Sequence, residues 1–154
     1  MIESVDFAKY ILLKAKERNL GEINVTKLQK LLYICDGTLL AFDCNAINEN
    51  ARAWYYGPVY PKVYKWFSKN PNYTPTITDI PVSAINEING GNYDAAINAT
   101  FTAFGSWNAT TLSGWSHQPN SPWSKAVEIN NGKMNCIIRK SDMAEYFKGI
   151  VHAN

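Results

Sequence analysis

The chain has 154 residues, of which 46% are hydrophobic and 18% are charged, with a formal net charge of +2. This length and composition predict one globular domain over residues 1–154, with enough apolar residues for a core. The small positive surplus does not favour nucleic-acid binding. Glu3 and Asp6 stand where a signal peptide has basic residues, and no apolar run reaches the ~20 residues of a membrane span. We therefore expect a cytoplasmic protein.

Residues that bind metals or nucleotides are few and poorly spaced. Cys35, Cys44 and Cys136 include no C-x-x-C pair, which favours reduced thiols over a disulfide framework or a zinc site. His152 lies near the end of the chain, without other ligands at known metal spacings. The sequence also contains no G-x-x-x-x-G-K-[ST] or G-x-G-x-x-G pattern. We expect neither a metal nor a cofactor.

Two helices are predicted in the N-terminal quarter. Apolar residues at a 3-4 spacing predict a helix over 5–20, with Ser4 as its N-cap and Gly21 at its end. Thr26 and Gln29 form a capping-box pattern, which predicts that a second helix begins at Thr26. The apolar stripe of this second helix comprises Leu28, Leu31, Leu32, Cys35 and Leu39. We expect the two helices to pack as an antiparallel pair.

The middle of the chain alternates short elements with proline-rich connections. Residues 51–55 are predicted to be extended, and Pro61 begins a helix that runs to about Ser68. Three prolines within 70–81 predict a surface loop. One helical turn is expected over 84–88, and a longer helix over 93–104.

The C-terminal third is also predicted to be helical. Asn108 caps a short helix that reaches Trp115, and Ser121 with Pro122 begins another that ends at 130–132. Residues 136–138 form a short strand, and Ser141 caps the last helix. The buried stripe of that helix comprises Met143, Tyr146, Phe147 and Ile150. The whole pattern predicts a mainly α fold: a single compact helical domain with a minor short β element.

Aromatic residues are concentrated between Trp54 and Phe67, where seven of fourteen residues are aromatic. A buried helix face takes about three or four positions in seven, so some of these rings must serve a second surface. Gly57 and Pro58 bend the backbone within this run. The rings left open between core and partner binding are Trp54, Tyr55, Tyr56 and Tyr60. Those expected in the core by helical spacing are Tyr33, Trp66, Phe67 and Tyr146.

Lysines flank this aromatic run on two predicted helices. Lys27 and Lys30 lie at the start of the second helix, and Lys62, Lys65 and Lys69 follow Pro61. Together they form either a basic patch for a partner or ordinary solvated helix faces. The near-neutral total charge favours solvated faces.

A polar loop between Trp115 and Trp123 contains His117, the first candidate for acid–base chemistry. No G-x-S-x-G or other nucleophile motif accompanies it. We interpret His117 as a structural residue whose ring nitrogens bond backbone groups, and Trp123, after Pro122, as a clamp on the loop. The alternative is a small hydrolase or nuclease that uses His117.

Three motifs in this order resemble the Panacea domain, also called SocA-like. They are residues 26–33, residues 53–64 with the Gly57-Pro58 break, and Ser116-His117 with Ser121-Pro122-Trp123. The resemblance covers nearly the whole chain. This family is known from phage-associated proteins and bacterial antitoxins that neutralise diverse toxins by direct binding. One member is an adaptor that delivers its toxin to the ClpXP protease.

The resemblance implies a binding module rather than an enzyme: an antitoxin whose partner is a cognate toxin. A proteolytic adaptor for a ClpXP-type protease is the alternative within the same family. Many members carry a further DNA-binding or other segment, for which this length leaves no room, so autoregulation by this chain alone is not expected. Residues 86–108 are rich in asparagine, where the family usually has a more charged helical stretch. Either partner choice lies there, or the segment has only drifted.

Overall fold

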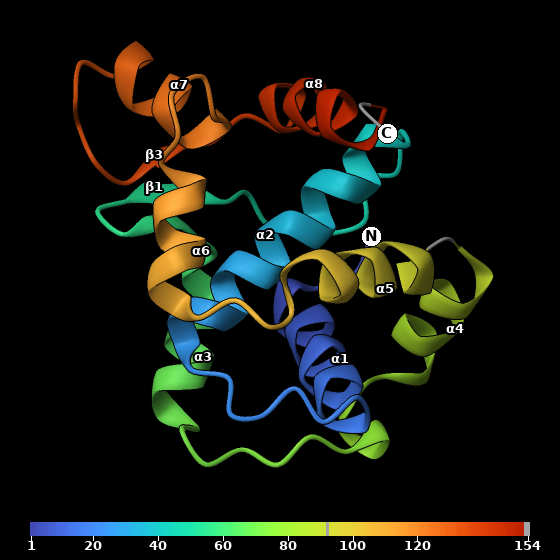
Figure 1. Ribbon diagram of the computed structural model, residues 1–154. Helices are drawn as coiled ribbons and strands as arrows, with labels where there is room; N and C mark the ends of the chain where they lie inside the picture. Colours follow the sequence, from blue (N-terminus) through green and yellow to red (C-terminus); the bar gives the residue numbers. More distant parts are fainter. Residues whose placement is uncertain (92, 153–154) are drawn as a thin grey trace.

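The computed structural model describes residues 1–91 and 93–152. Asn92, within the asparagine-rich segment, and the last two residues of the predicted domain lie outside the described residues. The described chain forms eight α-helices and one three-stranded sheet (Figure 1), and 61% of it is helical. This confirms the predicted mainly α fold with a minor β element. No helix in the described part combines the length and apolar character needed to cross a membrane.

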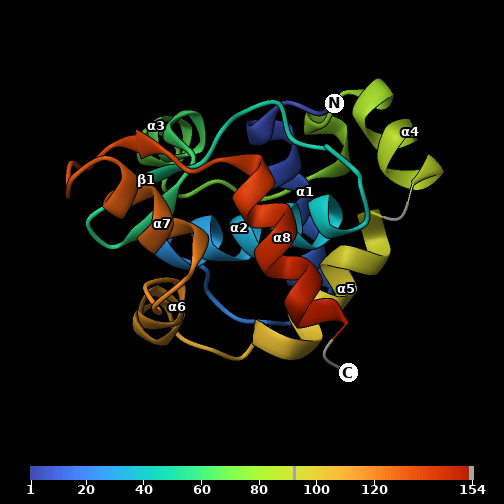
Figure 2. The ribbon, with the colours of Figure 1, turned by 90° about the horizontal axis from the view of Figure 1, so that it is seen from above.

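Helix α2 (Val25–Ala41) is the centre of the fold. Every residue from Lys27 to Ala41 is buried, so the predicted apolar stripe is confirmed but understates the burial. Helices from both ends of the chain surround α2 (Figures 1 and 2): α1 (Ser4–Glu17), α3 (Pro61–Lys69), α5 (Tyr93–Phe104), α6 (Ala109–Ser116) and α8 (Lys140–Val151). Polar side chains of α2 must therefore find partners inside the protein.

The predicted antiparallel pairing of the first two helices is wrong in its geometry. Helices α1 and α2 do contact each other, but α2 crosses α1 obliquely in both views (Figures 1 and 2). The physical reason is that α2 is covered on all sides by other helices, so α1 covers only a part of it. Helix α1 also ends at Glu17, earlier than predicted, and Gly21 follows with a φ of +80°.

Three predicted helix caps are corrected by the structure. Asn24 caps α2, because its Oδ1 accepts the Lys27 N–H at 2.8 Å, so the helix begins before the Thr26–Gln29 pattern. Ser4 does not cap α1; its hydroxyl donates to Glu49 Oε1 at 2.6 Å.

The third correction concerns the last helix. Ser141 is exposed and is the second residue of α8, whose N-cap is Arg139 without a side-chain hydrogen bond. An Asn or Ser near a predicted helix start therefore indicates reliably that a helix is present. It indicates less reliably at which residue the helix begins.

Other predicted boundaries are confirmed. Helix α5 spans Tyr93–Phe104. Asn108 caps α6 by accepting the Thr111 N–H at 2.8 Å. Ser121 caps α7 (Pro122–Ile129) by accepting the Ser124 N–H at 3.1 Å.

Two predicted segments contain more helix than expected. The predicted loop over 70–81 contains one 3₁₀ turn (Ile77–Asp79), and the predicted turn at 84–88 is a longer helix, α4 (Val82–Gly90).

The sheet is small and antiparallel. Its strands are β1 (Arg52–Trp54), β2 (Gly57–Val59) and β3 (Cys136–Ile137), in the order β2-β1-β3. Trp54 pairs with Gly57, so Tyr55 and Tyr56 form the turn between β1 and β2. The predicted extended segment and C-terminal strand are confirmed.

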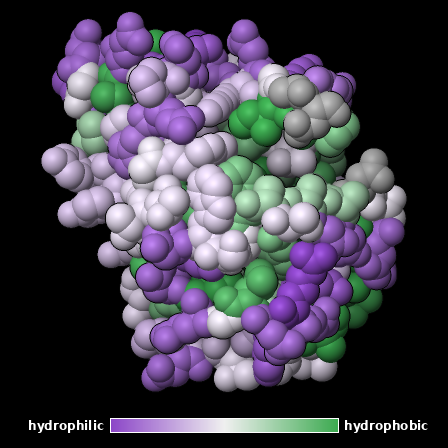
Figure 3. All heavy atoms as spheres, in the orientation of Figure 1, coloured by the Kyte–Doolittle hydropathy of each residue, from purple (hydrophilic) through white to green (hydrophobic). Residues whose placement is uncertain are grey.

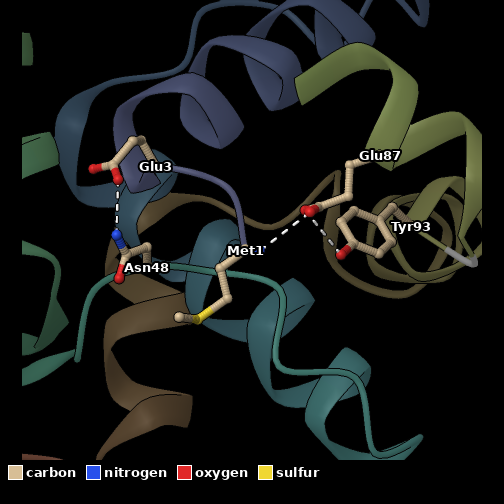
Figure 4. Close-up of polar contacts among 5 residues, drawn as sticks. All are labelled: Met1, Glu3, Asn48, Glu87 and Tyr93. Carbon is tan, nitrogen blue, oxygen red and sulfur yellow. Dashed lines mark hydrogen bonds and ion pairs between the residues drawn. The ribbon is translucent and has the colours of Figure 1, made fainter. Parts of the chain in front are cut away.

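The N-terminal residues are held on two sides (Figure 4). The Met1 amino group lies 3.1 Å from Glu87 Oε1 on α4, and Glu87 Oε2 accepts the Tyr93 hydroxyl at 3.2 Å. On the other side, Asn48 donates to Glu3 Oε1 at 2.7 Å. These contacts join α1, α4 and the segment after α2.

Candidate partner-binding site

The turn between β1 and β2 presents two tyrosine rings to solvent. Tyr55 is 75% exposed and Tyr56 is 72% exposed, and their ring centroids lie 5.4 Å apart in an edge-to-face arrangement. In Figure 3 the left edge, where this turn lies in Figure 1, projects as a pale surface of intermediate hydropathy. The left-handed backbone that the turn requires falls on Gly57, whose φ is +120°. Tyr55 and Tyr56 therefore occupy the turn without the strain that a positive φ causes in residues with a side chain.

Side chains from α6 and α7 hold the backbone on either side of this tip. The Trp123 indole N–H donates to the carbonyl of Trp54 at 2.8 Å. The Ser113 hydroxyl donates to the carbonyl of Tyr56 at 2.5 Å. We call residues 54–60 the clamped hairpin, because side chains from other elements bond its carbonyl groups.

His117 bridges the hairpin and α6. Its Nε2 lies 2.8 Å from the carbonyl oxygen of Tyr55, and its Nδ1 lies 2.5 Å from that of Ser113. The imidazole also contacts the Trp123 ring, with centroids 4.2 Å apart. Both ring nitrogens thus face backbone groups, which is the structural role predicted for His117. The predicted clamp by Trp123 is also present, although it acts on the hairpin through Trp54.

Two side chains of α2 hold the other arm of the hairpin. Gln29 accepts the Tyr60 N–H at 2.8 Å and donates to the Tyr60 carbonyl at 3.2 Å. The Lys30 ammonium donates to the Pro58 carbonyl at 3.1 Å. These groups are all buried, so each bond satisfies a backbone group that water does not reach.

Close packing explains the glycine in the hairpin. A Cβ on Gly57 would lie 2.6 Å from Lys30 Cε and 2.6 Å from Ser116 Oγ. The hairpin backbone thus lies against side chains of α2 and α6, which would have to move to admit a Cβ at this position.

Tyr60 belongs to the core, which corrects its place among the candidate partner-binding residues. It is fully buried, and its hydroxyl donates to Asp36 Oδ2 at 2.7 Å. Burial raises the pKa of the Asp36 carboxyl to about 6, although the Tyr60 hydrogen bond acts in the opposite direction. The second carboxyl oxygen, Oδ1, is buried without a hydrogen-bond partner among the described residues. Asp36 therefore anchors the hairpin from within α2.

The two lysines of α2 form neither a basic patch nor the solvated helix face that their sequence favours. Lys27 is 8% exposed and donates to the Gly105 carbonyl at 2.6 Å, and Lys30 is 1% exposed. Both lie in the buried helix α2, where packing on all sides covers their stems. Only Lys62, Lys65 and Lys69 on α3 are exposed.

A groove of about 600 Å³ lies beside the exposed tip. It is lined by three segments: the first turns of α2, the hairpin with α3, and the loop before β3. Trp54 is half-buried in this lining; its ring packs on Tyr64 with centroids 5.1 Å apart, and its indole N–H donates to Asn135 Oδ1 at 3.0 Å. The groove thus combines aromatic walls with a few polar groups.

The other aromatic predictions have a mixed outcome. Tyr33 is buried as expected, but Trp66, Phe67 and Tyr146 are only half-buried. Trp115 is also half-buried and packs on Phe104, with ring centroids 4.9 Å apart.

Residues that could hold a metal do not gather in the described part of the chain. No group of three or more His, Cys, Asp or Glu side chains there has metal-binding geometry. The three cysteines are free thiols.

Sequence reasoning missed three residues that hold the hairpin. The sequence predicts only a capping role for Gln29 and no role for Asp36 or Ser113. The available signal was that Gln29 and Asp36 are polar residues inside an otherwise apolar helix, a pattern that calls for buried partners. Ser113 carried no comparable signal, because serine is common at exposed helix positions.

A family model described as "Antitoxin SocA-like, Panacea domain" matches residues 28–124 of the 154. The match covers more than half of the chain, and the protein therefore belongs to this family. No curated protein and no solved structure matches the chain. Membership in an antitoxin family indicates a binding module and a toxin as the general class of partner. Gln29, the hairpin and Ser113 with His117 all lie within the matched region.

Proposed function

We propose that this protein is an antitoxin that neutralises a cognate toxin by direct protein–protein binding. The family supports an antitoxin role, and the clamped hairpin supports a binding surface at Tyr55 and Tyr56. Tyrosine is enriched at the centres of interfaces, because its ring gives a large contact area and a polar tip.

The observation that carries this proposal is the contrast between exposed rings and a fixed backbone. Ser113 on α6 and Trp123 on α7 donate to the carbonyls of Tyr56 and Trp54, and the His117 imidazole lies 2.8 Å from the carbonyl oxygen of Tyr55. A backbone that is ordered before binding loses little conformational entropy when the partner docks. The tip is therefore suited to binding a protein surface.

The test is co-expression with the open reading frame encoded next to this gene. If that product is a toxin, it arrests growth alone, and co-expression restores growth. The two chains should then co-purify as a complex. A harmless neighbour, or rescue without a complex, would contradict neutralisation by direct binding.

The same system separates a plain inhibitor from a proteolytic adaptor. The half-life of the toxin is measured with and without this protein, in cells with and without a ClpXP-type protease. An inhibitor leaves the half-life unchanged or longer. A half-life that shortens only in the presence of the protease would assign the adaptor role instead.

The bonding of His117 does not favour the hydrolase alternative. Both of its ring nitrogens lie at hydrogen-bond distance from backbone carbonyls, whereas a general base needs a free nitrogen within reach of the reacting group. His117 does line a small pocket together with Ser113 and Trp123, so it is the bonding of its two ring nitrogens that weighs against this alternative.

A further inference from the structure

The groove beside the exposed tip has an uncharged floor. Its lining includes the aromatic side chains of Trp54 and Tyr64 and the aliphatic side chain of Val59. Lys30 also lines the groove, but it is buried, and its ammonium donates to the Pro58 carbonyl at 3.1 Å. No other charged residue of the described chain belongs to the lining. A bound segment would therefore contact mainly rings and aliphatic groups inside the groove.

Arg52 lies at the rim of this groove. It is two residues from Trp54 on β1, so both side chains point to the same face of the sheet, and it pairs with Val59 on β2. Its guanidinium donates to the carbonyl of Asn135 at 2.8 Å. Trp54, Val59 and Asn135 all line the groove. A guanidinium has five donors, and this is the one hydrogen bond of the half-buried Arg52 side chain in the described part of the chain.

Two exposed lysines stand beside the same lining. Lys65 directly follows Tyr64 on α3, and Lys133 directly precedes Met134 in the loop before β3. Both of these neighbours line the groove. We call Arg52, Lys65 and Lys133 the basic rim. None of the three belongs to an ion pair within residues 1–91 and 93–152, so no carboxylate there neutralises the rim.

Acidic residues are absent from the segments that supply the hairpin, α3 and the loop before β3. Residues 50–78 contain four Lys or Arg, residues 129–141 contain three, and neither segment contains an Asp or Glu. The rest of the lining belongs to the first turns of α2. The acidic residue nearest to these turns in sequence is Glu22, which lines a different pocket, beside α1. An acidic ligand would therefore be attracted to the rim without repulsion from these segments.

We propose that this groove binds a segment of the partner protein in which apolar residues are flanked by acidic residues. This inference rests on the proposed function, because it describes what the toxin presents to the same surface. The apolar residues contact the rings of Trp54 and Tyr64, and the flanking carboxylates pair with the basic rim. Arg52 can bind a carboxylate through two parallel N–H bonds, whereas each lysine acts as a point charge.

The order of residues in the bound segment follows from the position of the charges. The floor of the groove is uncharged, so a carboxylate at the centre of the segment would lose water without gaining a counter-ion, which is costly. Carboxylates at the two ends stay partly solvated beside the basic rim. Attraction between exposed charges is screened by salt, so the affinity should fall as the salt concentration rises.

Three matched peptides test the inference on the unmodified full chain. Acetyl-Glu-Phe-Leu-Phe-Glu-amide carries the acidic flanks, acetyl-Gln-Phe-Leu-Phe-Gln-amide lacks their charge, and acetyl-Phe-Glu-Leu-Glu-Phe-amide carries the same charges inside. Binding is followed by NMR through the indole N–H of Trp54. We expect the first peptide to bind about fivefold more tightly than either of the others in about 50 mM salt, and less than about twofold more tightly in about 0.5 M salt. Equal affinities at low salt, or no shift with any peptide, would overturn the inference.

Two double variants with the same net charge locate the attraction. The rim variant carries Lys65→Gln and Lys133→Gln. The control variant carries Lys16→Gln and Lys148→Gln, which change exposed lysines on α1 and α8, outside the lining of the groove. The rim variant should lower the preference for acidic flanks to about twofold, and adding Arg52→Gln should abolish it, whereas the control should keep a preference of about fivefold. Equal losses in the rim and control variants would reveal an effect of net charge alone and would overturn the assignment to the rim.

An oligothymidine probe distinguishes a protein segment from a nucleic acid, which also combines rings with negative charge. We expect it to bind more weakly than the peptide with acidic flanks at the same salt concentration. Tighter binding of the oligonucleotide would overturn the assignment to a protein. These outcomes are independent of toxin neutralisation. A toxin complex that forms without any peptide preference refutes the groove alone, whereas a peptide preference without a toxin complex refutes only the proposed antitoxin role.

Discussion

The backbone of the clamped hairpin and the two rings at its tip differ in hydrogen bonding and in exposure to solvent. Carbonyls from Trp54 to Tyr60 accept hydrogen bonds from side chains of α2, α6 and α7, while the rings of Tyr55 and Tyr56 stand in solvent. Stability should therefore depend on the residues that hold the backbone, and binding should depend on the two rings. A fold that separates these roles tolerates changes at the tip without unfolding.

The largest effect is expected at Gly57. Gly57→Ala places a Cβ 2.6 Å from Lys30 Cε and from Ser116 Oγ, at a φ of +120°. Overpacking and backbone strain together should lower the free energy of unfolding by about 4 kcal/mol. Urea denaturation measures this change.

Gly21→Ala is the matched control, because Gly21 also has a positive φ but has no atom within 4 Å of its added Cβ. It should lose only the strain contribution, about 1 kcal/mol. Equal losses at both glycines would show that the hairpin is not held tightly between α2 and α6.

The second effect is expected at Gln29. Gln29→Met removes both bonds to the Tyr60 backbone while conserving most of the side-chain volume. The buried Tyr60 N–H is left without a partner, whereas its carbonyl keeps the bond from the Tyr64 N–H at 3.0 Å. The change should cost about 2 kcal/mol in the free energy of unfolding. Thr26→Ala, a change in the first turn of the same helix, should cost less than about 1 kcal/mol, since Asn24 caps α2. Denaturant midpoints that shift equally for the two variants would argue against this anchor.

An effect of similar size is expected from Asp36 through pH. Its folded-state pKa is raised from 3.8 to about 6 by burial. A raised carboxyl pKa stabilises the folded state below the unfolded value, and this stabilisation is lost as the pH rises through about 6. The contribution should fall by about 2 kcal/mol between pH 4 and pH 7.

Asp36→Asn isolates this contribution. The difference in unfolding free energy between the variant and the natural protein should change with pH across that window and level off above it. An unchanged difference from pH 4 to pH 7 would mean that Asp36 titrates normally. Lys140 and Tyr60, the groups that act on Asp36, are present in both proteins.

The sequence predicts the elements well where local signals decide them. Asn108 and Ser121 cap their helices because a short polar side chain precedes an apolar run. It predicts the surroundings of the lysines poorly, because Lys27 and Lys30 look like solvated residues by type. Their burial follows from the tertiary packing of helices around α2, which no local pattern encodes.

The candidate site shows the same division. The aromatic run identifies the hairpin, and the Gly57-Pro58 pair identifies its bend. Which rings face outward depends on the β1–β2 register, with Trp54 opposite Gly57, and on the bond from Tyr60 to Asp36, 24 residues away in sequence. The register is a local feature of the hairpin, but the bond to Asp36 is long-range, so Tyr60 could not be separated from Tyr55 and Tyr56 by sequence alone.

The separation of roles is tested most directly by Tyr55→Ala with Tyr56→Ala in one protein. Two exposed rings contribute little to folding, so the free energy of unfolding should change by less than about 1 kcal/mol. Affinity for the product of the neighbouring open reading frame should fall by about 2 kcal/mol or more, roughly a thirtyfold change in Kd.

Phe42→Ala is the control for that measurement, because Phe42 is an exposed aromatic residue just after the C-terminal end of α2, outside the groove and the hairpin. Calorimetric titration of the three proteins gives the answer. The account predicts loss of binding in the tyrosine variant alone, with all three proteins equally folded. Unchanged affinity in a folded tyrosine variant would contradict it and would place the interface elsewhere.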